Sequence, residues 1–379
     1  MVASPSFWET DTLLRKADLL IIGSGIVGLS AALAAKANDP HLRIVVIERG
    51  CLPTGASTRN AGFACFGSMT ELLDDLTTQS EEEVFALVAR RYAGLRRLRE
   101  RVGDTALHYE NHGGTELFSE RDALIFAECA DQMTHFNQQL HRIVGIKNVY
   151  TVANEKLALC GFRQIKNLIH NCAEGQIDTG KMMAALLRQA YANDIQVLNG
   201  LTIKTITEHA DEITLHSDDG IDLRTAQVLV CTNGFTRRLL PHLAVVPARN
   251  QVLITAPIAD LPWRGCFHYE AGYFYFRNVG NRILLGGGRN KDPETEQTDE
   301  FGSNHLIQKT LLNLLHTVIL PQQTPVIEQW WSGILGVGAI KKPIIERLSP
   351  RLTVAVRMGG MGVAIGSLVG EEGAALALS

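Results

Sequence analysis

The run Asp18-Leu-Leu-Ile-Ile-Gly-Ser-Gly-Ile-Val-Gly28 carries the strongest structural signal in the sequence. Its apolar first half predicts a short buried strand. The glycines that follow have the spacing Gly23-x-Gly25-x-x-Gly28, and the alanine- and leucine-rich stretch from Leu29 to Ala37 favours a helix. A second apolar strand, from Leu42 to Ile47, ends at Glu48. This order predicts a βαβ unit with parallel strands.

The glycine spacing has a chemical meaning when it joins a strand to a helix. Gly23 would make the tight turn, Gly25 would let the backbone approach a pyrophosphate, and Gly28 would let the helix pack closely on the strand. The N-terminus of this helix offers free N–H groups and a positive dipole end to phosphates. Glu48 would accept hydrogen bonds from a ribose. We therefore predict a dinucleotide site.

Composition limits the other classes. A chain of 379 residues with 46% hydrophobic and 20% charged residues predicts two globular domains, and a formal net charge of −4 disfavours a nucleic-acid partner. The seven cysteines are scattered without a CxxC pair, which disfavours a disulfide framework and a zinc site, so we predict no metal and a cytoplasmic location. The apolar run 17–22 is too short to span a bilayer, so membrane contact is expected to be peripheral at most.

Five further segments resemble, in the right order, motifs of the FAD-dependent D-amino-acid oxidase, glycine oxidase and sarcosine oxidase superfamily. Gly55-Ala-Ser-Thr-Arg-Asn-Ala-Gly62 is similar to the GASxRNxG segment of that family. The other four resemble its second FAD motif, its VxPxRGQ segment, its hairpin in amine-oxidising members and its closing glycine-rich turn. They are Val228–Gly234, Val246–Gln251, Tyr275–Arg277 with Arg282–Gly288, and Gly359–Ala364.

The resemblance implies an α/β fold. It would have a Rossmann-like FAD-binding domain of the glutathione-reductase type and a second, mixed-sheet α+β substrate domain. We expect the FAD domain to be discontinuous and the substrate domain to take the rest of the chain. The expected boundaries are 15–80, 160–240 and 325–379 for the first domain, and 81–159 and 241–324 for the second.

The motifs also predict the residues that hold FAD. A helix starting at the closing glycines would stabilise negative charge on a reduced flavin, and Ser57, Arg59 and Asn60 can hydrogen-bond a cofactor. The predicted cofactor residues are Gly23, Gly25, Ile26, Gly28, Glu48, Arg49, Ser57, Thr58, Arg59, Asn60, Ala61, Gly62, Ile203, Thr232, Asn233, Gly234, Gly333, Gly359, Gly360, Met361 and Gly362. We expect non-covalent FAD, because the loop 55–62 has no histidine and the segment 335–342 has no cysteine.

The chain departs from the resembled family at the substrate site. Leu335 stands where glycine and D-amino-acid oxidases carry the arginine that binds the substrate carboxylate. Arg277 is a candidate substitute, although a surface arginine is an equally good interpretation. Tyr275 and Trp331 could wall an apolar or cationic substrate or could be core aromatics. His268 lies near these strands, but a lone histidine is more often structural.

The resemblance implies hydride transfer from a carbon bearing an amine to flavin N5, in a small amine or amino acid. Electrons would pass on to oxygen, a quinone or a carrier. One alternative is a 2-hydroxy-acid or polyol dehydrogenase, which needs a base that only His268 could provide. Another is a flavin-binding, non-catalytic subunit with a sealed cavity, which the missing arginine would support.

The stretch 81–101 has helical spacing, with Val84, Val88 and Leu95 on one side. We interpret its six arginines as a solvated face rather than a phosphate-binding patch. Further helices are predicted at 121–144, 179–193 and 304–317. The segment 50–68 is predicted to be a loop.

Overall fold

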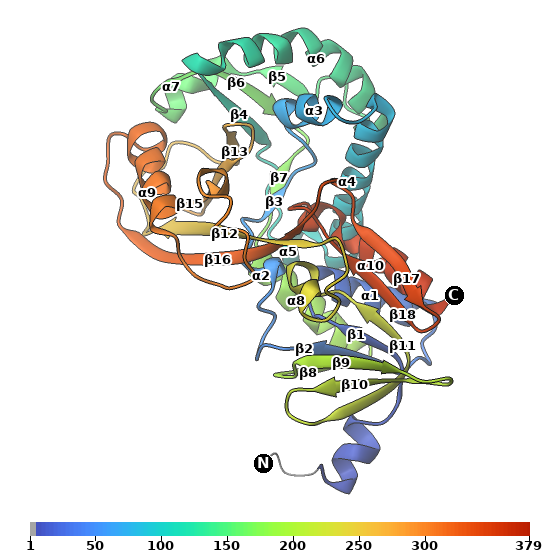
Figure 1. The fold of residues 1–379 in the computed structure, drawn as a ribbon. Coiled ribbons are helices and arrows are strands. Elements are labelled where there is room, and N and C mark those ends of the chain that lie inside the picture. The colour runs from blue at the N-terminus through green and yellow to red at the C-terminus, as the bar shows by residue number, and fades with distance from the viewer. Residues whose placement is uncertain (1–4) are drawn as a thin grey trace.

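Two eight-stranded sheets organise the part of the chain that the structure describes, residues 5–379 of a computed structural model (Figure 1). The first sheet has the order β17-β18-β11-β1-β2-β8, with β10 and β9 continuing from β11. Its strands are β1 (Ala17–Ile22), β2 (Ile44–Glu48), β8 (Gln196–Asn199), β9 (Ile203–Glu208), β10 (Ile213–Ser217), β11 (Asp222–Val230), β17 (Ile344–Ser349) and β18 (Leu352–Val356).

The predicted βαβ unit is confirmed. β1 lies between β2 and β11 and is parallel to both, and α1 (Ile26–Asn38) follows the glycine turn. β1 is buried on both faces, since Leu19 and Ile21 pack into one core cluster and Leu20 and Ile22 into another. This two-sided burial explains why the strand is an uninterrupted apolar run.

Helices cover one face of the first sheet. α10 (Gly362–Leu378) lies against α1, and a Cβ at Gly370 would collide with the carbonyl oxygen of Val27. α4 (Glu81–Val102) packs on α10, and α8 (Thr179–Ala192) packs on α1. The opposite face is covered by the antiparallel strands β9 and β10, whose apolar residues pack on those of β1 and β2.

The second sheet is mixed, as predicted. Its order is β16-β12-β15-β14-β13-β4-β6-β5, in which β13 and β4 are parallel and the other pairs antiparallel. α9 (His305–Leu314) packs on this sheet near β12 and β15. Its strands are β4 (Gly114–Ser119), β5 (Tyr150–Val152), β6 (Ile165–Asn171), β12 (Val246–Thr255), β13 (Cys266–Tyr269), β14 (Phe274–Val279), β15 (Arg282–Gly287) and β16 (Ile327–Val337).

The structure corrects the predicted domain boundaries in three places. β6 and β16 lie in segments that we assigned to the FAD domain, yet β6 pairs with β4 and β16 pairs with β12 along its whole length. α4 lies in a segment assigned to the substrate domain, yet it packs on α10. A strand belongs to the sheet that supplies its hydrogen-bond partners, and those partners are distant in sequence.

The predicted loop 50–68 is more regular than expected. It contains α2 (Ala56–Arg59) and β3 (Phe63–Ala64), which pairs with β7 (Gly175–Gln176) between the two large sheets. The remaining helices are α3 (Met69–Leu76), α5 (Asp104–Leu107), α6 (Ala123–Val144) and α7 (Leu157–Cys160). In residues 5–379 we find no helix with the length and apolar character needed to cross a membrane.

Candidate active site

A cavity of about 770 Å³ lies between the two sheets. On one side it is lined by residues at the carboxyl ends of β1, β2 and β11, including Ile22, Glu48 and Thr232. On the other side it reaches β13 and β14, where His268 and Tyr275 line it. Ligands of open α/β sheets bind at the carboxyl ends of the strands, and this volume lies within the range of cofactor sites.

The glycine turn has the geometry that the sequence predicts. A Cβ at Gly28 would overlap the carbonyl oxygen of Gly23, so only glycine lets α1 approach the turn this closely. Gly23 has a φ of +112°, in the region that favours glycine. Gly25 lines the cavity and is the N-cap of α1.

Glu48 is the last residue of β2, and hydrogen bonds fix its carboxylate. Its Oε2 accepts hydrogen bonds from the Ser24 hydroxyl at 2.7 Å and the Ser24 N–H at 3.3 Å, and its Oε1 accepts from the Gly50 N–H at 3.1 Å. Glu48 is buried but lines the cavity. These bonds fix the carboxylate where a ribose would meet it.

Two helices that begin at the cavity, α1 and α10, have N-cap residues that form no side-chain hydrogen bond. The N-caps of α1 and α10 are Gly25 and Met361, which offer no side-chain hydrogen bond, and neither helix has an acidic residue in its first turn. By contrast, α3, α4 and α8 are capped by Ser68, Ser80 and Asp178. At α1 the Ile26 N–H donates to the Ser57 hydroxyl at 2.9 Å. The other N–H groups and the positive dipole ends at the starts of α1 and α10 suit a ligand with negative charge.

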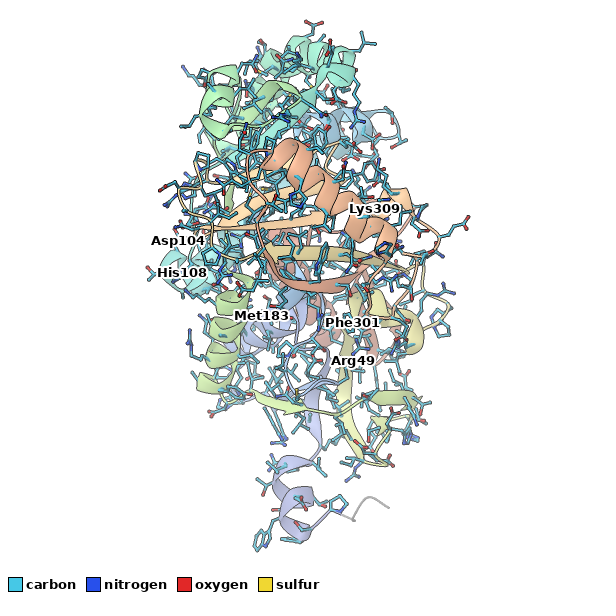
Figure 2. All side chains as sticks on the ribbon, turned by 90° about the vertical axis from the view of Figure 1, so that its left-hand side faces the viewer. Arg49, Asp104, His108, Met183, Phe301 and Lys309 are labelled. Carbon is cyan, nitrogen blue, oxygen red and sulfur yellow. The ribbon has the colours of Figure 1, made fainter. Side chains whose placement is uncertain are left out.

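A stack of aromatic and arginine side chains borders the same region. Arg49 lies 3.6 Å over the Phe235 ring, Phe235 lies 5.8 Å from Phe301, and Arg59 lies 4.2 Å over Phe301. In Figure 2 Arg49 and Phe301 lie one above the other on the same side of the molecule. These contacts connect Arg49 and Arg59, which line the cavity, to the segment around Phe301.

Arg277 and Trp331, which we predicted to contact the substrate, instead bind the backbone of the segment 59–62. Arg277 is buried and does not line the cavity, because its guanidinium donates to the backbone carbonyls of Ala61 and Ile177. Trp331 is also outside the lining, and its indole N–H donates to the Arg59 carbonyl at 3.0 Å. The structure therefore contradicts a substrate contact for both. Each holds the segment 59–62 in place.

Most other predicted site residues line the cavity, and three do not. Gly28 and Gly62 serve close backbone packing, and the Thr58 hydroxyl donates to the Pro53 carbonyl at 2.8 Å. The predicted residues that line the cavity are Gly23, Gly25, Ile26, Glu48, Arg49, Ser57, Arg59, Asn60, Ala61, Ile203, Thr232, Asn233, Gly234, His268, Tyr275, Gly333, Gly359, Gly360, Met361 and Gly362.

The side chains of β13 and β14 that line the cavity, His268 and Tyr275, are aromatic, and we call this end of the cavity the chamber. The Phe63 ring lies 5.2 Å from His268 and 5.6 Å from Tyr275, in edge-to-face contacts. Burial lowers the pKa of His268 to about 4 and raises the pKa of Tyr275 to about 12. Both side chains are therefore neutral at pH 7.

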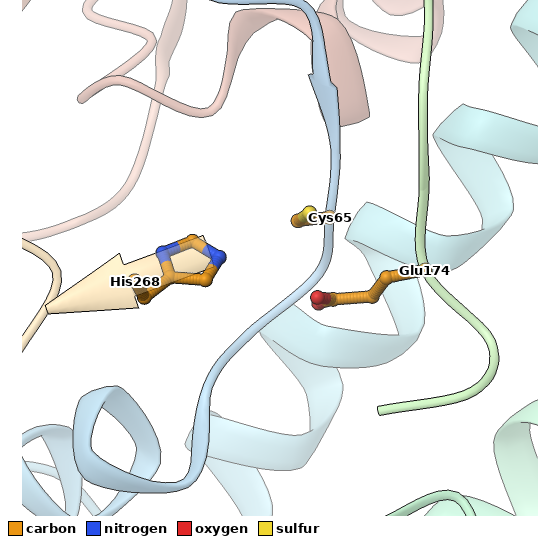
Figure 3. A group of neighbouring side chains, drawn as sticks. All are labelled: Cys65, Glu174 and His268. Carbon is orange, nitrogen blue, oxygen red and sulfur yellow. The ribbon is translucent and has the colours of Figure 1, made fainter. Parts of the chain in front are cut away.

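Cys65, Glu174 and His268 form a compact group beside this chamber (Figure 3). Their sulfur, oxygen and nitrogen atoms lie within 4.8 Å of one another. Burial raises the pKa of Cys65 and raises that of Glu174 to about 7, and Glu174 accepts hydrogen bonds from the N–H groups of Phe66 and Gly67. A protonated thiol and a neutral imidazole can both take part in hydrogen bonds.

The sequence interpretation missed a buried ion pair at the cavity. Arg91 of α4 lies 3.0 Å from Glu71 and donates to the Phe66 carbonyl, so it is not part of a solvated face. Burial alone would raise the pKa of Glu71, but Arg91 and Lys341 outweigh it and lower that pKa to about 2. The signal was available, since Arg91 continues the apolar spacing of Val84 and Val88.

The pattern of the FAD dependent oxidoreductase family matches residues 18–376. The chain belongs to this family. Two curated relatives are each described as "Probable oxidoreductase OrdL". The one from Rhizobium meliloti is 24% identical over 96% of this chain and 83% of its own length. The one from Haemophilus influenzae is 21% identical over 95% and 82%.

Solved structures share the fold of this family member. L-proline dehydrogenase from P. horikoshii superposes with a TM-score of 0.74 at 17% identity, over 96% of this chain and 93% of its own. Glycine oxidase from Geobacillus kaustophilus gives 0.74 at 20% identity, over 94% and 93%. Iminodiacetate oxidase from Chelativorans sp. BNC1 gives 0.72 at 20% identity, over 93% of each chain.

This protein is therefore an FAD-dependent oxidoreductase, and the cavity fits its cofactor. A Cβ at Gly25 would lie 3.0 Å from the Ser57 hydroxyl oxygen, so glycine leaves the backbone at the start of α1 accessible to a pyrophosphate, and Glu48 is fixed for a ribose. The uncapped start of α10 offers a second positive end to the cofactor. When bound, FAD supplies the two-electron chemistry of the reaction.

The carboxyl group of Glu116, beside the chamber, leads us to predict that the stability of the folded protein depends on pH. It is buried, accepts hydrogen bonds from Thr70, and has its pKa raised by burial to about 7 from 4.5. The folded state then binds this proton more tightly, so the contribution of Glu116 to stability is complete below pH 4.5 and is lost as the pH rises to 7. We expect Glu116→Gln to gain on the order of 2 kcal/mol relative to the wild type between these limits.

The measurement is thermal unfolding of both proteins from pH 4.5 to 7.5. The melting temperature of the variant should rise relative to that of the wild type across this range. Glu100→Gln, at an exposed carboxylate on α4, should show no such trend. Parallel curves for Glu116→Gln and the wild type would show that Glu116 titrates normally.

Proposed function

We propose that this oxidoreductase oxidises a small amine or amino acid at the carbon that bears the nitrogen. The observation that supports this best is the continuity of the cavity. One end of the cavity is the dinucleotide cradle, formed by the glycine turn 23–28 and Glu48. The other end is an aromatic chamber in which His268 and Tyr275 are neutral. The names of the similar structures, which include a glycine oxidase and an L-proline dehydrogenase, agree with an amine substrate.

The chain would act by desolvation and orientation. A chamber walled by Phe63, His268 and Tyr275 favours the neutral amine over the ammonium form, because burial penalises charge. The nitrogen lone pair would then assist departure of the hydrogen and its two electrons from the adjacent carbon, with FAD as their acceptor. The resulting imine is hydrolysed by water to a carbonyl compound and a free amine.

Alcohol oxidation is the weaker candidate. It needs a base to take the hydroxyl proton, and the lowered pKa of His268 makes it a poor proton acceptor. A flavin-binding, non-catalytic subunit is the less favoured alternative, because the family that the chain matches is one of FAD dependent oxidoreductases. The choice of oxygen, a quinone or a carrier as electron acceptor stays a prediction, as does a cytoplasmic location.

The test is an anaerobic titration of the FAD-loaded protein with matched compounds. The panel pairs amino acids and N-methyl amino acids with the corresponding 2-hydroxy acids, and it includes simple amines. We expect bleaching of the visible flavin band by one or more nitrogen compounds and no bleaching by their hydroxy analogues. Bleaching by hydroxy acids alone, or by no compound, would contradict the proposal.

FAD should be released when the protein is denatured. The cavity-lining thiols Cys65 and Cys231 are poor nucleophiles because burial raises the pKa of both. Acid precipitation followed by absorption spectroscopy should find the flavin in the supernatant. A yellow pellet that keeps its flavin after washing would contradict this prediction, because it would indicate a covalent bond between flavin and protein.

A further inference from the structure

Arg289 is a cation at the cavity with no protein partner among residues 5–379. It follows β15, lines the cavity and is partly exposed. Its guanidinium makes no hydrogen bond or ion pair with the described part of the chain. The other cavity-lining arginines each have a partner, namely Arg49 with Phe235, Arg59 with Thr54 and Ser332, Arg91 with Glu71, and Arg238 with Asp299 and Glu300.

Two polar side chains of the same sheet line the cavity near Arg289. Tyr275 packs over Gly286, where a Cβ would lie 2.8 Å from its hydroxyl oxygen, and the charge of Arg289 reaches this phenol. Asn250 of β12 lines the cavity beside the Tyr275 hydroxyl, and a hydrogen bond from its side chain lowers the pKa of that phenol. The side-chain oxygen of Asn250 is itself buried without a hydrogen-bond donor in residues 5–379. A buried acceptor without a donor is costly, so Asn250 is suited to an N–H group of a ligand.

The backbone around Arg289 is held on both sides. The Gly288 N–H donates to the Tyr273 carbonyl at 2.8 Å. The Lys291 ammonium lies 3.0 Å from Glu270, which also pairs with Arg121. These contacts fix the segment after β15 to the turn between β13 and β14, so that Arg289 is presented to the cavity from a defined backbone position.

We propose that Arg289 binds a carboxylate of the substrate, with the Tyr275 hydroxyl as a second donor and the Asn250 side-chain oxygen accepting from the substrate nitrogen. A guanidinium fork matches a carboxylate with two parallel hydrogen bonds. Leu335 also lines the cavity but has no group that can bind an anion. Resting on the proposed function, this inference narrows the substrate class to amines that carry a carboxylate.

The experiment measures binding of simple carboxylates to the FAD-loaded protein. Acetate and propanoate are titrated, with acetamide and propanamide as uncharged matches, and the shift of the flavin absorption band is followed. We expect the carboxylates to bind the wild type, and Arg289→Met to weaken this binding roughly tenfold to a hundredfold, the scale of a lost charge-assisted hydrogen bond. Arg289→Lys should fall between, because it keeps the charge and loses the fork.

Arg264→Met is the matched control. Arg264 is an exposed arginine outside the cavity lining, so its removal changes the net charge equally and should leave acetate binding unchanged. Equal acetate affinity in the wild type and Arg289→Met would overturn the inference, as would acetate binding no better than acetamide. Arginine-dependent acetate binding in a protein that no amine reduces would contradict the proposed function while supporting Arg289 as a carboxylate site.

Discussion

We expect Gly28→Val to abolish FAD binding and to destabilise the first sheet. Any Cβ at residue 28 overlaps the carbonyl oxygen of Gly23 and lies 3.3 Å from the Ile21 side chain. Neither neighbour can give way, because Gly23 belongs to the turn and β1 lies between two parallel strands. Valine would therefore push α1 off β1 and move the N–H groups at its start. We expect a loss of more than about 4 kcal/mol, the range of severe core damage.

Flavin content of the purified protein and urea unfolding measure this effect. Gly28→Ala should behave like the valine variant, because the Cβ itself causes the overlap. Gly180→Ala is the control, since it lies in α8 outside the cavity lining and its Cβ would have 3.3 Å to the nearest atom, in Asp178. This control should keep its FAD and gain slightly in helix propensity. An FAD-loaded, fully stable Gly28→Ala protein would refute the close packing of α1.

Arg91→Leu should be the most damaging substitution in the arginine-rich helix. It leaves Glu71, whose side chain is 23% exposed, with only Lys341 at 3.6 Å. It also removes the donor to the Phe66 carbonyl, which holds the segment between β3 and α3. Removing one member of a buried ion pair typically costs 3–5 kcal/mol, and we expect about 3 kcal/mol here because Lys341 remains.

A double variant separates loss of the pair from loss of packing. Arg91→Leu with Glu71→Leu removes both charges, so most of the stability should return. Arg96→Leu, at an exposed arginine of the same helix, should change the unfolding free energy by less than about 0.5 kcal/mol. If Arg91→Leu is as mild as Arg96→Leu in urea unfolding, then the ion pair is solvated and the sequence interpretation of α4 was correct.

The βαβ unit and its glycine turn could be predicted because their signal is local. An apolar run, a fixed glycine spacing and an acidic residue at the end of the second strand all lie between Asp18 and Glu48, and the structure places them as expected. The motif order along the chain also predicted the family, although each motif is short.

The errors concern side chains whose partners are distant in sequence. Arg277 is two residues from Tyr275 on β14, as the predicted shared face requires, but its guanidinium donates to the Ala61 carbonyl and does not line the cavity. Trp331 is bound to the Arg59 carbonyl for the same reason. β16 was assigned to the wrong sheet because its partner β12 lies far earlier in the chain. Arg289 was overlooked because a solitary arginine after three glycines forms no recognisable pattern.

If the proposed function holds, the bond that breaks in the chamber beside the cofactor site is the C–H bond next to the substrate nitrogen. The most direct test is rapid anaerobic mixing of the FAD-loaded protein with the best nitrogen compound of the panel, carrying either hydrogen or deuterium on that carbon. We predict bleaching of the visible flavin band that is slower with deuterium, since this bond breaks as the electrons leave. Bleaching at equal rates for both isotopes, or an unchanged spectrum, would contradict the claim.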